Sequence, residues 1–406
     1  MRKKGRRRRF GEAAALSNVS FSCSAERYLN ISSRPKTQEK VPTNMTQKSA
    51  LIAMSGGVDS SVAALLMQKV GYDCIGVTMK LFDNEDVGVS REKSCCSLSD
   101  VDDARSVTTR LAIPYYVVNF AENFKEKVIE PFVCAYERGF TPNPCIDCNR
   151  YLKFKKLYQR ASELDCDYIV TGHYVRLGYD QTHKRYTLSK AIDSHKDQSY
   201  VLYFLTQEQL AHAQFPLGNL TKEEVRAYAE EYGLVTAHKQ ESQDICFVQT
   251  GDYADFIENY RHKPSQPGPI VTKEGLKVGE HKGLIRYTIG QRRGLGVAYK
   301  EPLFVCSKDV ATNTLIVCTA DQLHTKSILV DEVNWVSIAG IEDKLECQVK
   351  VRYSSQPQLA QLIKGKDETQ VKVVFAQEIP GAACGQAAVF YNGDLVLGGG
   401  IITASL

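Results

Sequence analysis

Short apolar runs alternate with amphipathic stretches along the first half of the chain. Residues 51–54 are apolar and end close to a glycine pair, which predicts a buried parallel strand followed by a tight loop. Residues 60–70 then carry apolar side chains at helical spacing, and residues 72–79 predict a second strand. A strand, a glycine loop, a helix and a strand in this order are typical of a doubly wound α/β domain with a parallel sheet.

The same alternation continues to about residue 232. The spacing predicts a helix over 101–111, for which Asp100 is the candidate N-cap. The other expected helices cover 124–136, 153–164, 208–214 and 222–232, and the other expected strands cover 114–118 and 168–173. The repeated pattern supports the α/β assignment.

The pattern changes after about residue 262. A linker rich in proline over 264–269 is followed by short β-rich runs with frequent glycine. The runs cover 283–287, 303–305, 315–317, 347–352, 371–375 and 387–391. They predict one small β domain and then a β-barrel, and they are also compatible with a single β domain. We therefore expect an extension over 1–47, an α/β domain over 48–255, a central β domain over 256–322 and a C-terminal barrel over 323–406.

The composition is that of a globular protein, and its charge is unevenly distributed. Of the 406 residues, 43% are hydrophobic and 24% are charged, and no apolar run approaches the length of a membrane span. The net charge is +4, but residues 1–45 carry 11 Lys and Arg against 3 Asp and Glu. The remainder is therefore net negative, so binding to a nucleic acid would need local basic patches.

The cysteines and the N-terminal segment bear on the compartment. Thirteen cysteines at irregular spacing, with no apolar signal-peptide core, favour reduced thiols in a cytosol-like compartment, and we expect a cytoplasmic protein. The run Arg6–Arg9, followed by Ser-rich and acid-poor sequence, is compatible with an organellar transit peptide. A disordered tail is the alternative, as is an extension upstream of the natural start, because Met45 lies just ahead of the predicted body.

The segment Ser55 to Ser61 is a candidate phosphate-binding loop. Gly56 and Gly57 let the backbone approach an anion closely, and Ser60 lies at the start of the predicted helix, where free N–H groups attract phosphate. Asp59 is a candidate ligand for Mg²⁺ or for a ribose. The loop lacks the lysine of the usual triphosphate cradle, and an ordinary glycine turn is the structural alternative.

Two further segments carry candidate reactive cysteines. In Thr141 to Asn149, two prolines stiffen the loop ahead of a helix expected from Lys153, so Cys148 would lie where a helix dipole lowers a thiol pKa. In Glu241 to Phe247, Cys246 stands among polar residues. Cys145 and Cys148 are also compatible with half of a zinc site, but no second pair at this spacing follows.

The loop resembles the pyrophosphate loop of the N-type ATP pyrophosphatases, which cleave ATP between the α and β phosphates and adenylate a carbonyl oxygen. The chain as a whole, from about Ala50, resembles the tRNA-specific 2-thiouridylase family, which modifies uridine 34 of tRNA. The resemblance rests on residues 55–61, 76–79, 141–149, 171–174, 196–200, 242–247, 290–294, 351–353 and 385–391. It implies a HUP-like fold of the adenine nucleotide α-hydrolase class, with ATP and Mg²⁺ as cofactors.

The resemblance also implies roles for individual residues. Cys148 would be the nucleophile, Cys246 would carry a persulfide, and the two would form a transient disulfide. ATP would be bound by Ala53, Met54, Ser55, Gly56, Gly57, Val58, Asp59, Ser60, Met79 and Gly172. The target base and the rest of the tRNA would be bound by Asn143, Pro144, Cys145, His173, Lys196, Asp197, Gln198, Arg352, Tyr353 and Gln386. The partners would be tRNA and a sulfur donor protein, such as a cysteine desulfurase or a relay protein. No association with a membrane would be expected.

Cys145 departs from the pattern of the family. Some members have an aspartate there, which is a candidate acid or base, whereas in this chain Asp147 lies nearby but offset. Cys145, Cys148 and Cys246 are therefore also a candidate ligand set for a [4Fe–4S] cluster with one open iron site.

Two other functions stay open at this point. An amidating or ligating enzyme of the same superfamily would leave the two cysteines without a role. An RNA-binding protein with a relic nucleotide site would not need an intact loop beside two cysteines.

Overall fold

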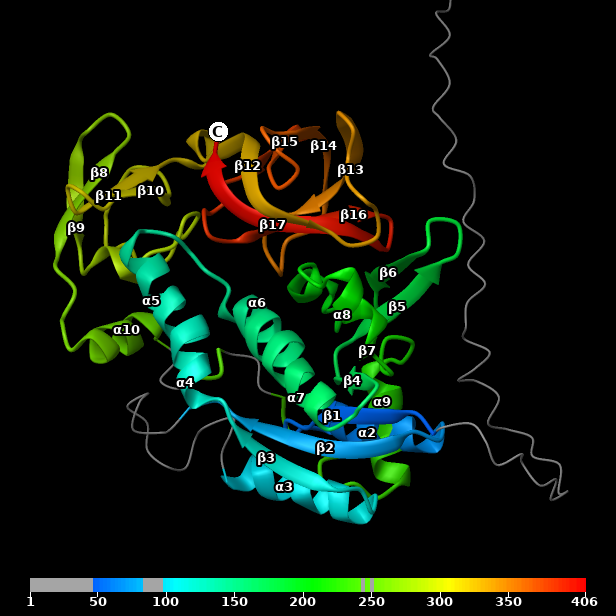
Figure 1. Ribbon diagram of the computed structural model, residues 1–406. Helices are drawn as coiled ribbons and strands as arrows, with labels where there is room; N and C mark the ends of the chain where they lie inside the picture. The colour runs from blue at the N-terminus through cyan, green and yellow to red at the C-terminus, as the bar shows by residue number, and fades with distance from the viewer. Residues whose placement is uncertain (1–46, 83–97, 242–244, 249–251) are drawn as a thin grey trace, which may run out of the picture. The chain divides into compact units, whose positions relative to one another are not determined.

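The computed structural model describes residues 47–82, 98–241, 245–248 and 252–406. A parallel sheet forms the centre of the N-terminal half (Figure 1). Its strands are β1 (Ser49–Ala53), β2 (Asp73–Lys80), β3 (Tyr115–Asn119), β4 (Tyr168–Val170) and β7 (Ala213–Gln214). They lie in the order β3-β2-β1-β4-β7, and every pairing is parallel. Leu51 and Ile52 of β1 are completely buried, as their apolar run predicts, so the expected doubly wound α/β fold is confirmed.

The helices of the α/β half follow the predicted periodicity, with different ends. They are α2 (Val58–Lys69), α3 (Leu98–Arg110), α4 (Ala121–Phe124), α5 (Glu130–Glu137), α6 (Pro144–Asp147), α7 (Tyr158–Glu163), α8 (Gln207–Ala211), α9 (Lys222–Glu231) and α10 (Tyr253–Arg261). Two π-helical segments, η1 (Lys125–Ile129) and η2 (Cys148–Leu157), continue α4 into α5 and α6 into α7. Short 3₁₀ segments are η3 (Ser199–Leu202), η4 (Leu284–Arg286) and η5 (Ala320–Gln322).

Some of the predicted elements were wrong. The helix expected over 208–214 ends at Ala211, and Ala213 and Gln214 form β7. Asp100 lies inside α3 rather than at its N-cap. The helix expected from Lys153 begins at Pro144, because the Asn143 side chain caps it and proline suits the first helical position. The expected strand over 283–287 contains the 3₁₀ turn η4 instead.

The C-terminal half consists of two antiparallel-rich β units. The first is a four-stranded sheet of β8 (Gly268–Thr272), β9 (Lys277–His281), β10 (Phe304–Asp309) and β11 (Thr314–Cys318). The second contains β12 (His324–Trp335), β13 (Lys344–Lys350), β14 (Gln358–Lys364), β15 (Val371–Pro380), β16 (Ala387–Asn392) and β17 (Leu395–Ser405). Because β17 also pairs with β12, these strands close into the predicted barrel.

A hairpin that the sequence did not reveal joins the two halves. Strands β5 (Val175–Asp180) and β6 (Arg185–Lys190) follow β4 in the chain, yet β6 pairs with β17 of the barrel. One hydrophobic cluster includes Leu51 of the parallel sheet together with Tyr200 and Val389, and the Tyr200 hydroxyl donates to the Ala387 carbonyl at 2.8 Å. The predicted boundary between 255 and 256 falls inside α10, so the exact division into domains stays a prediction.

Candidate active site

The segment Met54–Gly57 joins the carboxyl end of β1 to α2. Gly56 has φ +73, and a Cβ there would lie 2.4 Å from the carbonyl oxygen of Asp100, so only glycine fits. Gly57 is the N-cap of α2 and makes no side-chain cap. The Ser60 hydroxyl accepts from the Ser55 amide and donates to the Gly57 carbonyl, both at 3.1 Å, which closes the loop on itself. This arrangement leaves the first turn of α2 suited to an anion.

The loop lies at the switch point of the sheet. The chain leaves β1 for β2 on one side, and β4 borders β1 on the other, which is where doubly wound sheets bind ligands. Gly172 lies two residues after the end of β4, and a Cβ on it would lie 2.8 Å from both the carbonyl carbon of Asp59 and the amide nitrogen of Ser60. The structure thus brings together Gly172 and the loop, two parts of the predicted ATP site that are far apart in sequence. ATP binding at these residues stays a prediction.

Asp59 is part of a charged network that the sequence did not reveal. Its Oδ1 accepts from the Tyr174 hydroxyl and from Lys222 Nζ, each at 2.7 Å. Lys222, whose side chain is 7% exposed, also pairs with Glu241 at 2.8 Å, and Lys196 pairs with Glu241 at 2.6 Å. Burial raises the pKa of Glu241, but hydrogen bonds from Lys196 and Lys222 outweigh it and lower that pKa to about 2.

The two predicted reactive cysteines lie at the margin of one apolar cluster. Cys148 begins the π-helical segment η2, one turn after the helix start, and π-helical turns are frequent at functional sites. Cys246, Cys148 and Met79 all pack against the same buried cluster, in which Phe247 and Phe132 have ring centroids 5.3 Å apart. The structure therefore gathers the predicted nucleophile, the predicted persulfide position and one predicted ATP contact around one core.

Cys145 and Asp147 face different surroundings. Cys145 is exposed, and its amide donates to the Asn143 side chain at 3.2 Å. Burial raises the pKa of Asp147 to about 7, against the opposing charge of Arg150, which itself pairs with Glu332 of the barrel at 3.3 Å. Asp147 is thus a carboxyl group that titrates near neutral pH beside Cys148.

Several predicted tRNA contacts take part in internal bonds. Lys196 pairs with Glu241, and Gln198 accepts from the Tyr174 amide at 3.0 Å. Asp197 accepts from the Ser199 hydroxyl at 2.8 Å. The bonds hold the loop before η3 in place, and contacts of its residues with tRNA stay predictions.

Arg352, Tyr353 and Gln386 meet around a cavity of about 240 Å³. Its lining residues are Thr141, Thr288, Arg352, Tyr353, Ser354, Ala383 and Gln386. Gln386 donates to the Thr141 carbonyl at 2.7 Å, so the barrel reaches the loop just ahead of the helix that carries Cys145 and Cys148. Tyr353 is 45% exposed and offers a ring face for stacking.

His173 has an interior environment. It is 7% exposed, its Nδ1 lies 2.7 Å from the Thr171 hydroxyl, and its ring packs near Phe154 and Phe215. Burial holds the pKa of the imidazole well below its ordinary value, so the ring is neutral. Its contact with tRNA stays a prediction, and in this conformation the side chain packs in the core.

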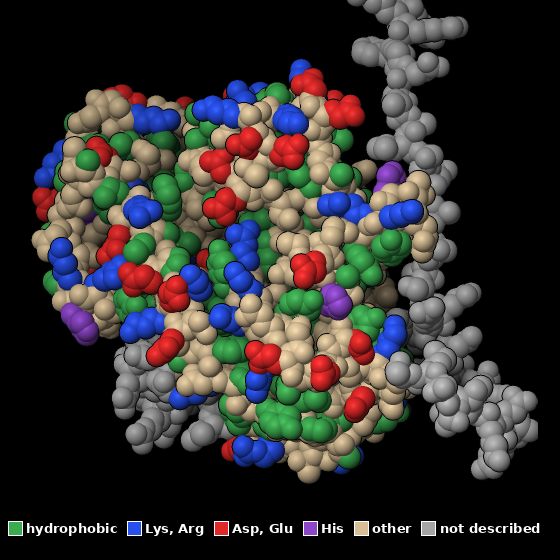
Figure 2. Space-filling model, viewed as in Figure 1, with side chains coloured by type: hydrophobic (Ala, Val, Ile, Leu, Met, Phe, Trp, Pro, Cys, Tyr) green, Lys and Arg blue, Asp and Glu red, His purple; other side chains and the backbone are tan. Residues whose placement is uncertain are grey.

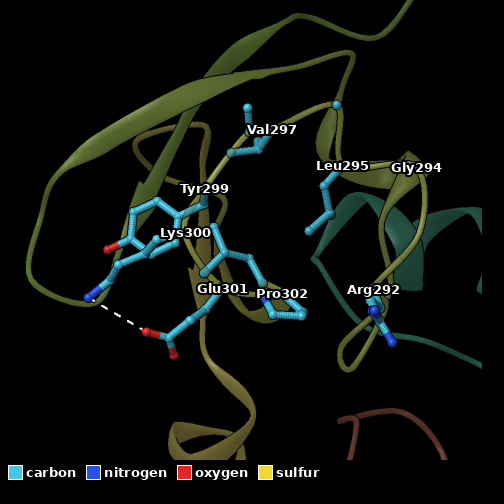
Figure 3. Close-up of a pocket in the computed structure, with 11 residues that line it drawn as sticks. Arg292, Gly294, Leu295, Val297, Tyr299, Lys300, Glu301 and Pro302 are labelled. Carbon is cyan, nitrogen blue, oxygen red and sulfur yellow. Dashed lines mark ion pairs between the residues drawn. The ribbon is translucent and has the colours of Figure 1, made fainter.

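A larger cavity of about 680 Å³ lies in the loop 292–303 of the central β unit (Figure 3). Leu295, Val297 and Pro302 line it, with the ion pair of Lys300 and Glu301 at its edge. It contains none of the predicted site residues. On the face shown in Figure 2, Lys and Arg side chains are interspersed with Asp and Glu side chains.

The described residues do not bring three metal-ligating side chains together. Within the ranges given above, no group of His, Cys, Asp or Glu is arranged to hold a metal ion. Cys145, Cys148 and Cys246 therefore do not form a ligand set here, and Asp59 already accepts from Lys222. Separately, no helix in the described part of the chain is long and apolar enough to cross a bilayer.

The chain matches known protein families over most of its length. Residues 48–250 match the family model of the tRNA methyl transferase HUP domain, 254–319 the tRNA methyl transferase PRC-barrel domain, and 325–402 the aminomethyltransferase beta-barrel domain. The tRNA-specific 2-thiouridylase MnmA of Clostridioides difficile is 46% identical over 359 residues, which are 88% of this chain and 99% of that protein. The protein of the same name from Desulforamulus reducens is 47% identical over 361 residues, 89% of this chain and 98% of its own length.

The family models are described by methyl transfer, whereas the relatives matched over nearly their whole length are named for thiolation. A solved 4-thiouridine synthetase–RNA complex with bound ATP is 19% identical, covers 50% of this chain and 45% of that one, and has a TM-score of 0.32.

Proposed function

This chain belongs to the tRNA-specific 2-thiouridylase family, and we propose that it uses ATP to transfer sulfur to C2 of uridine 34 in tRNA. The carrying observation is the packing of Cys148 and Cys246 against one cluster beside Met79. The nucleotide loop and Gly172 lie at the carboxyl ends of the neighbouring strands. A nucleotide loop and two cysteines packed against one cluster are the groups that ATP-dependent sulfur transfer uses.

The proposed reaction has three steps. O2 of the uridine attacks the α phosphate of ATP, pyrophosphate leaves, and the C2 oxygen becomes part of an AMP leaving group. The terminal sulfur of a persulfide on Cys246 then attacks C2 and displaces AMP. The Cys148 thiolate attacks the inner sulfur of Cys246, so that a disulfide forms and the outgoing sulfur stays on C2 with the electron pair. A dithiol reductant then resets the cysteines.

The residues around the cysteines support parts of this scheme. The base would enter beside Asn143, Pro144 and Cys145 after leaving the anticodon stack, as base-modifying enzymes require. Tyr353 would offer a stacking face, and Arg352 and Lys196 would supply positive charge. Because the described residues form no metal-binding group, no step is assigned to Mg²⁺ or to an iron–sulfur cluster.

The proposed reaction needs a sulfur donor and a reducing compartment. Its sulfur would come from a donor protein such as a cysteine desulfurase or a relay protein, since the scheme needs a persulfide on Cys246. We place the reaction in a reducing, cytoplasm-like compartment. Residues 1–46 lie outside the described part of the chain, so an organellar role for the Arg-rich segment stays a prediction.

The test is a reconstituted reaction with tRNA, ATP and protein loaded with persulfide. Nucleoside mass spectrometry measures 2-thiouridine, and separate assays measure AMP and pyrophosphate. We expect Cys246→Ser to release pyrophosphate in the presence of tRNA, since adenylation still proceeds, but to release no AMP by sulfur attack and to form no 2-thiouridine. Cys148→Ser should stop after sulfur reaches C2. Cys166→Ser is the matched control, because this half-buried thiol precedes β4 at the opposite end of the sheet.

The outcomes separate the proposal from its alternatives. If Cys246→Ser still forms 2-thiouridine, the assignment of the persulfide is wrong. An amidating or ligating enzyme would release AMP without any dependence on either cysteine. An RNA-binding protein with a relic site would bind tRNA and release no AMP.

A further inference from the structure

Glu332 of the barrel forms an ion pair with the helix that carries Cys148. Its Oε2 lies 3.3 Å from Nη1 of Arg150, which follows Cys148 by two positions in η2. The Arg150 side chain is 20% exposed, and its guanidinium carbon lies 5.5 Å from the ring centroid of Phe204. A carboxylate of β12 and an aromatic ring that follows η3 therefore both contact this arginine.

The backbone of Glu332 has a conformation that favours glycine. Its φ is +53, and it lies in a β-bulge, where the register of β12 with β17 shifts just after Asp331. Asp331 accepts from the Gln370 side chain at 2.8 Å. On the other side of Glu332, the Val333 amide donates to the Thr369 carbonyl at 2.9 Å. Strained residues that their neighbours hold in place cluster at functional sites, and bulges re-aim side chains there.

The same strand also holds the segment that Arg150 contacts. Asn334 Nδ2 donates to the carbonyls of the residues before and after Phe204, at 2.8 and 3.0 Å. These bonds fix the backbone that carries the Phe204 ring, and Glu332 holds the guanidinium over that ring. Two residues of β12 thus position Arg150, which shares the first π-helical turn of η2 with Cys148.

We infer that Glu332 is a positioning residue, which fixes through Arg150 the orientation of the turn that begins at Cys148. The inference rests on the proposed function and concerns its last step, in which the Cys148 thiolate attacks the inner sulfur of Cys246. Glu332 touches no reacting atom. Because its side chain is 66% exposed, the ion pair adds little to stability, and its effect falls on the geometry of the helix start.

A slow last step leaves a distinctive intermediate. Sulfur attack on C2 releases AMP and leaves the tRNA joined to Sγ of Cys246 through an S–S bond. The Cys148 thiolate then attacks that Sγ, the S–S bond breaks, the Cys148–Cys246 disulfide forms, and the departing sulfur stays on C2 with the electron pair. A misplaced Cys148 therefore prolongs the life of a covalent protein–tRNA adduct and spares the release of pyrophosphate and AMP in the first turnover.

The experiment follows a single turnover with labelled tRNA, ATP and protein loaded with persulfide. Denaturing gels without reductant measure the adduct, and separate assays measure pyrophosphate, AMP and 2-thiouridine. For Glu332→Gln we expect the adduct to decay about fivefold to twentyfold more slowly than in wild type, because small misplacements of reacting groups slow a reaction strongly. The amounts of pyrophosphate and AMP released in the first turnover should stay within about twofold of wild type.

A second variant, Glu332→Gly, separates positioning from stability. Glycine adopts a φ of +53 without strain, so the urea midpoint should not fall below that of wild type, while the adduct should decay as slowly as in Glu332→Gln. Glu332→Asp keeps the charge and should recover part of the rate. Glu378→Gln is the matched control, because this barrel carboxylate is 57% exposed and lies 4.0 Å from His324, and it should leave adduct decay unchanged.

A further measurement does not depend on turnover. Iodoacetamide labelling of Cys148, whose side chain is partly buried, is followed by peptide mass spectrometry in the protein without tRNA. Glu332→Gln and Glu332→Gly should each change the labelling rate by about threefold or more relative to wild type, and Glu378→Gln should not change it.

The outcomes distinguish this inference from the proposed function. Wild-type protein that forms neither adduct nor 2-thiouridine refutes the function, and the labelling rates then decide alone whether Glu332 positions Cys148. An unchanged labelling rate, or an adduct that decays as fast in both Glu332 variants as in wild type, overturns the positioning role and leaves the function intact. Parallel losses of pyrophosphate release, AMP release and adduct decay also overturn it, because they indicate a general structural defect.

Discussion

Replacing Gly172 by alanine tests the close approach of β4 to the nucleotide loop. The added methyl group would lie 2.8 Å from the carbonyl carbon of Asp59 and 2.8 Å from the amide nitrogen of Ser60. Carbon atoms in contact settle at about 3.5–4.0 Å, so the two backbones must separate by roughly 1 Å. Because both neighbours are main-chain atoms, which yield less than a flexible side chain, the free energy of unfolding should fall by about 1–3 kcal/mol.

The same separation displaces the first turn of α2, where ATP is expected to bind. We expect the affinity for a non-hydrolysable ATP analogue, measured by isothermal titration calorimetry, to fall by about tenfold or more. Gly71→Ala is the control, because Gly71 follows α2 at its other end, has φ +91 and has no atom of the described chain within 4 Å of its Cβ position. It should cost about 1 kcal/mol of stability through backbone strain and leave the affinity unchanged.

The stability and the nucleotide affinity of Gly172→Ala can be measured separately. Urea denaturation reports stability separately from the affinity. If Gly172→Ala loses stability but binds the analogue as tightly as wild type, the contact does not shape the nucleotide site. If Gly71→Ala weakens binding equally, the effect comes from the general loss of stability.

Three further predictions concern stability. Asp147→Asn should raise the free energy of unfolding at pH 8 by about 2–4 kcal/mol, because burial lifts the carboxyl pKa from 3.8 to about 7 and wild type loses stability as pH rises through this window. Urea denaturation should show that the difference disappears below pH 4, and a difference independent of pH would contradict the cause. Glu241 has the opposite sign: with its pKa lowered from 4.5 to about 2, its contribution is present above pH 4.5 and disappears towards pH 2, so Glu241→Gln should flatten the acid limb of the stability profile. Arg352→Met should destabilise the protein without tRNA by about 2–4 kcal/mol, since Arg352 donates to the carbonyls of Ile289 and Gly381, both at 2.9 Å, and an unchanged urea midpoint would refute this role.

Local sequence patterns were enough to predict the nucleotide half of the site. The apolar run of β1, the glycine pair and the helical spacing after it act over neighbouring residues, and the structure has the strand, loop and helix that they predict. For the helix that carries Cys148, the predicted start at Lys153 was too late in the sequence. Its start depends on the capping bond from Asn143, and proline inside the predicted loop was interpreted as a stiffener rather than as the first helical residue.

These local patterns could not predict which distant segments pair with one another. The hairpin β5–β6 is ordinary in sequence, and only its register with β17 makes it an extension of the barrel. Resemblance to a family indicated Lys196 as a tRNA contact, but its pairing with Glu241 could not be foreseen. His173 likewise follows a predicted strand, and only the packing of Phe154 and Phe215 around it shows that the ring is buried.

The sequence by itself therefore determined the class of fold and the strand, glycine loop and helix at its start, because short-range periodicity and glycine geometry act locally. The reactive roles of Cys148 and Cys246, which the family resemblance implies, stay predictions. The tertiary structure alone decided how these parts meet. Lys222 reaches Asp59 across 163 positions of the chain, and no periodicity relates residues at such a separation. Closure of the barrel and the packing of Cys148 and Cys246 on one cluster likewise depend on the whole fold, since contacts between distant segments form only when the sheets and helices pack.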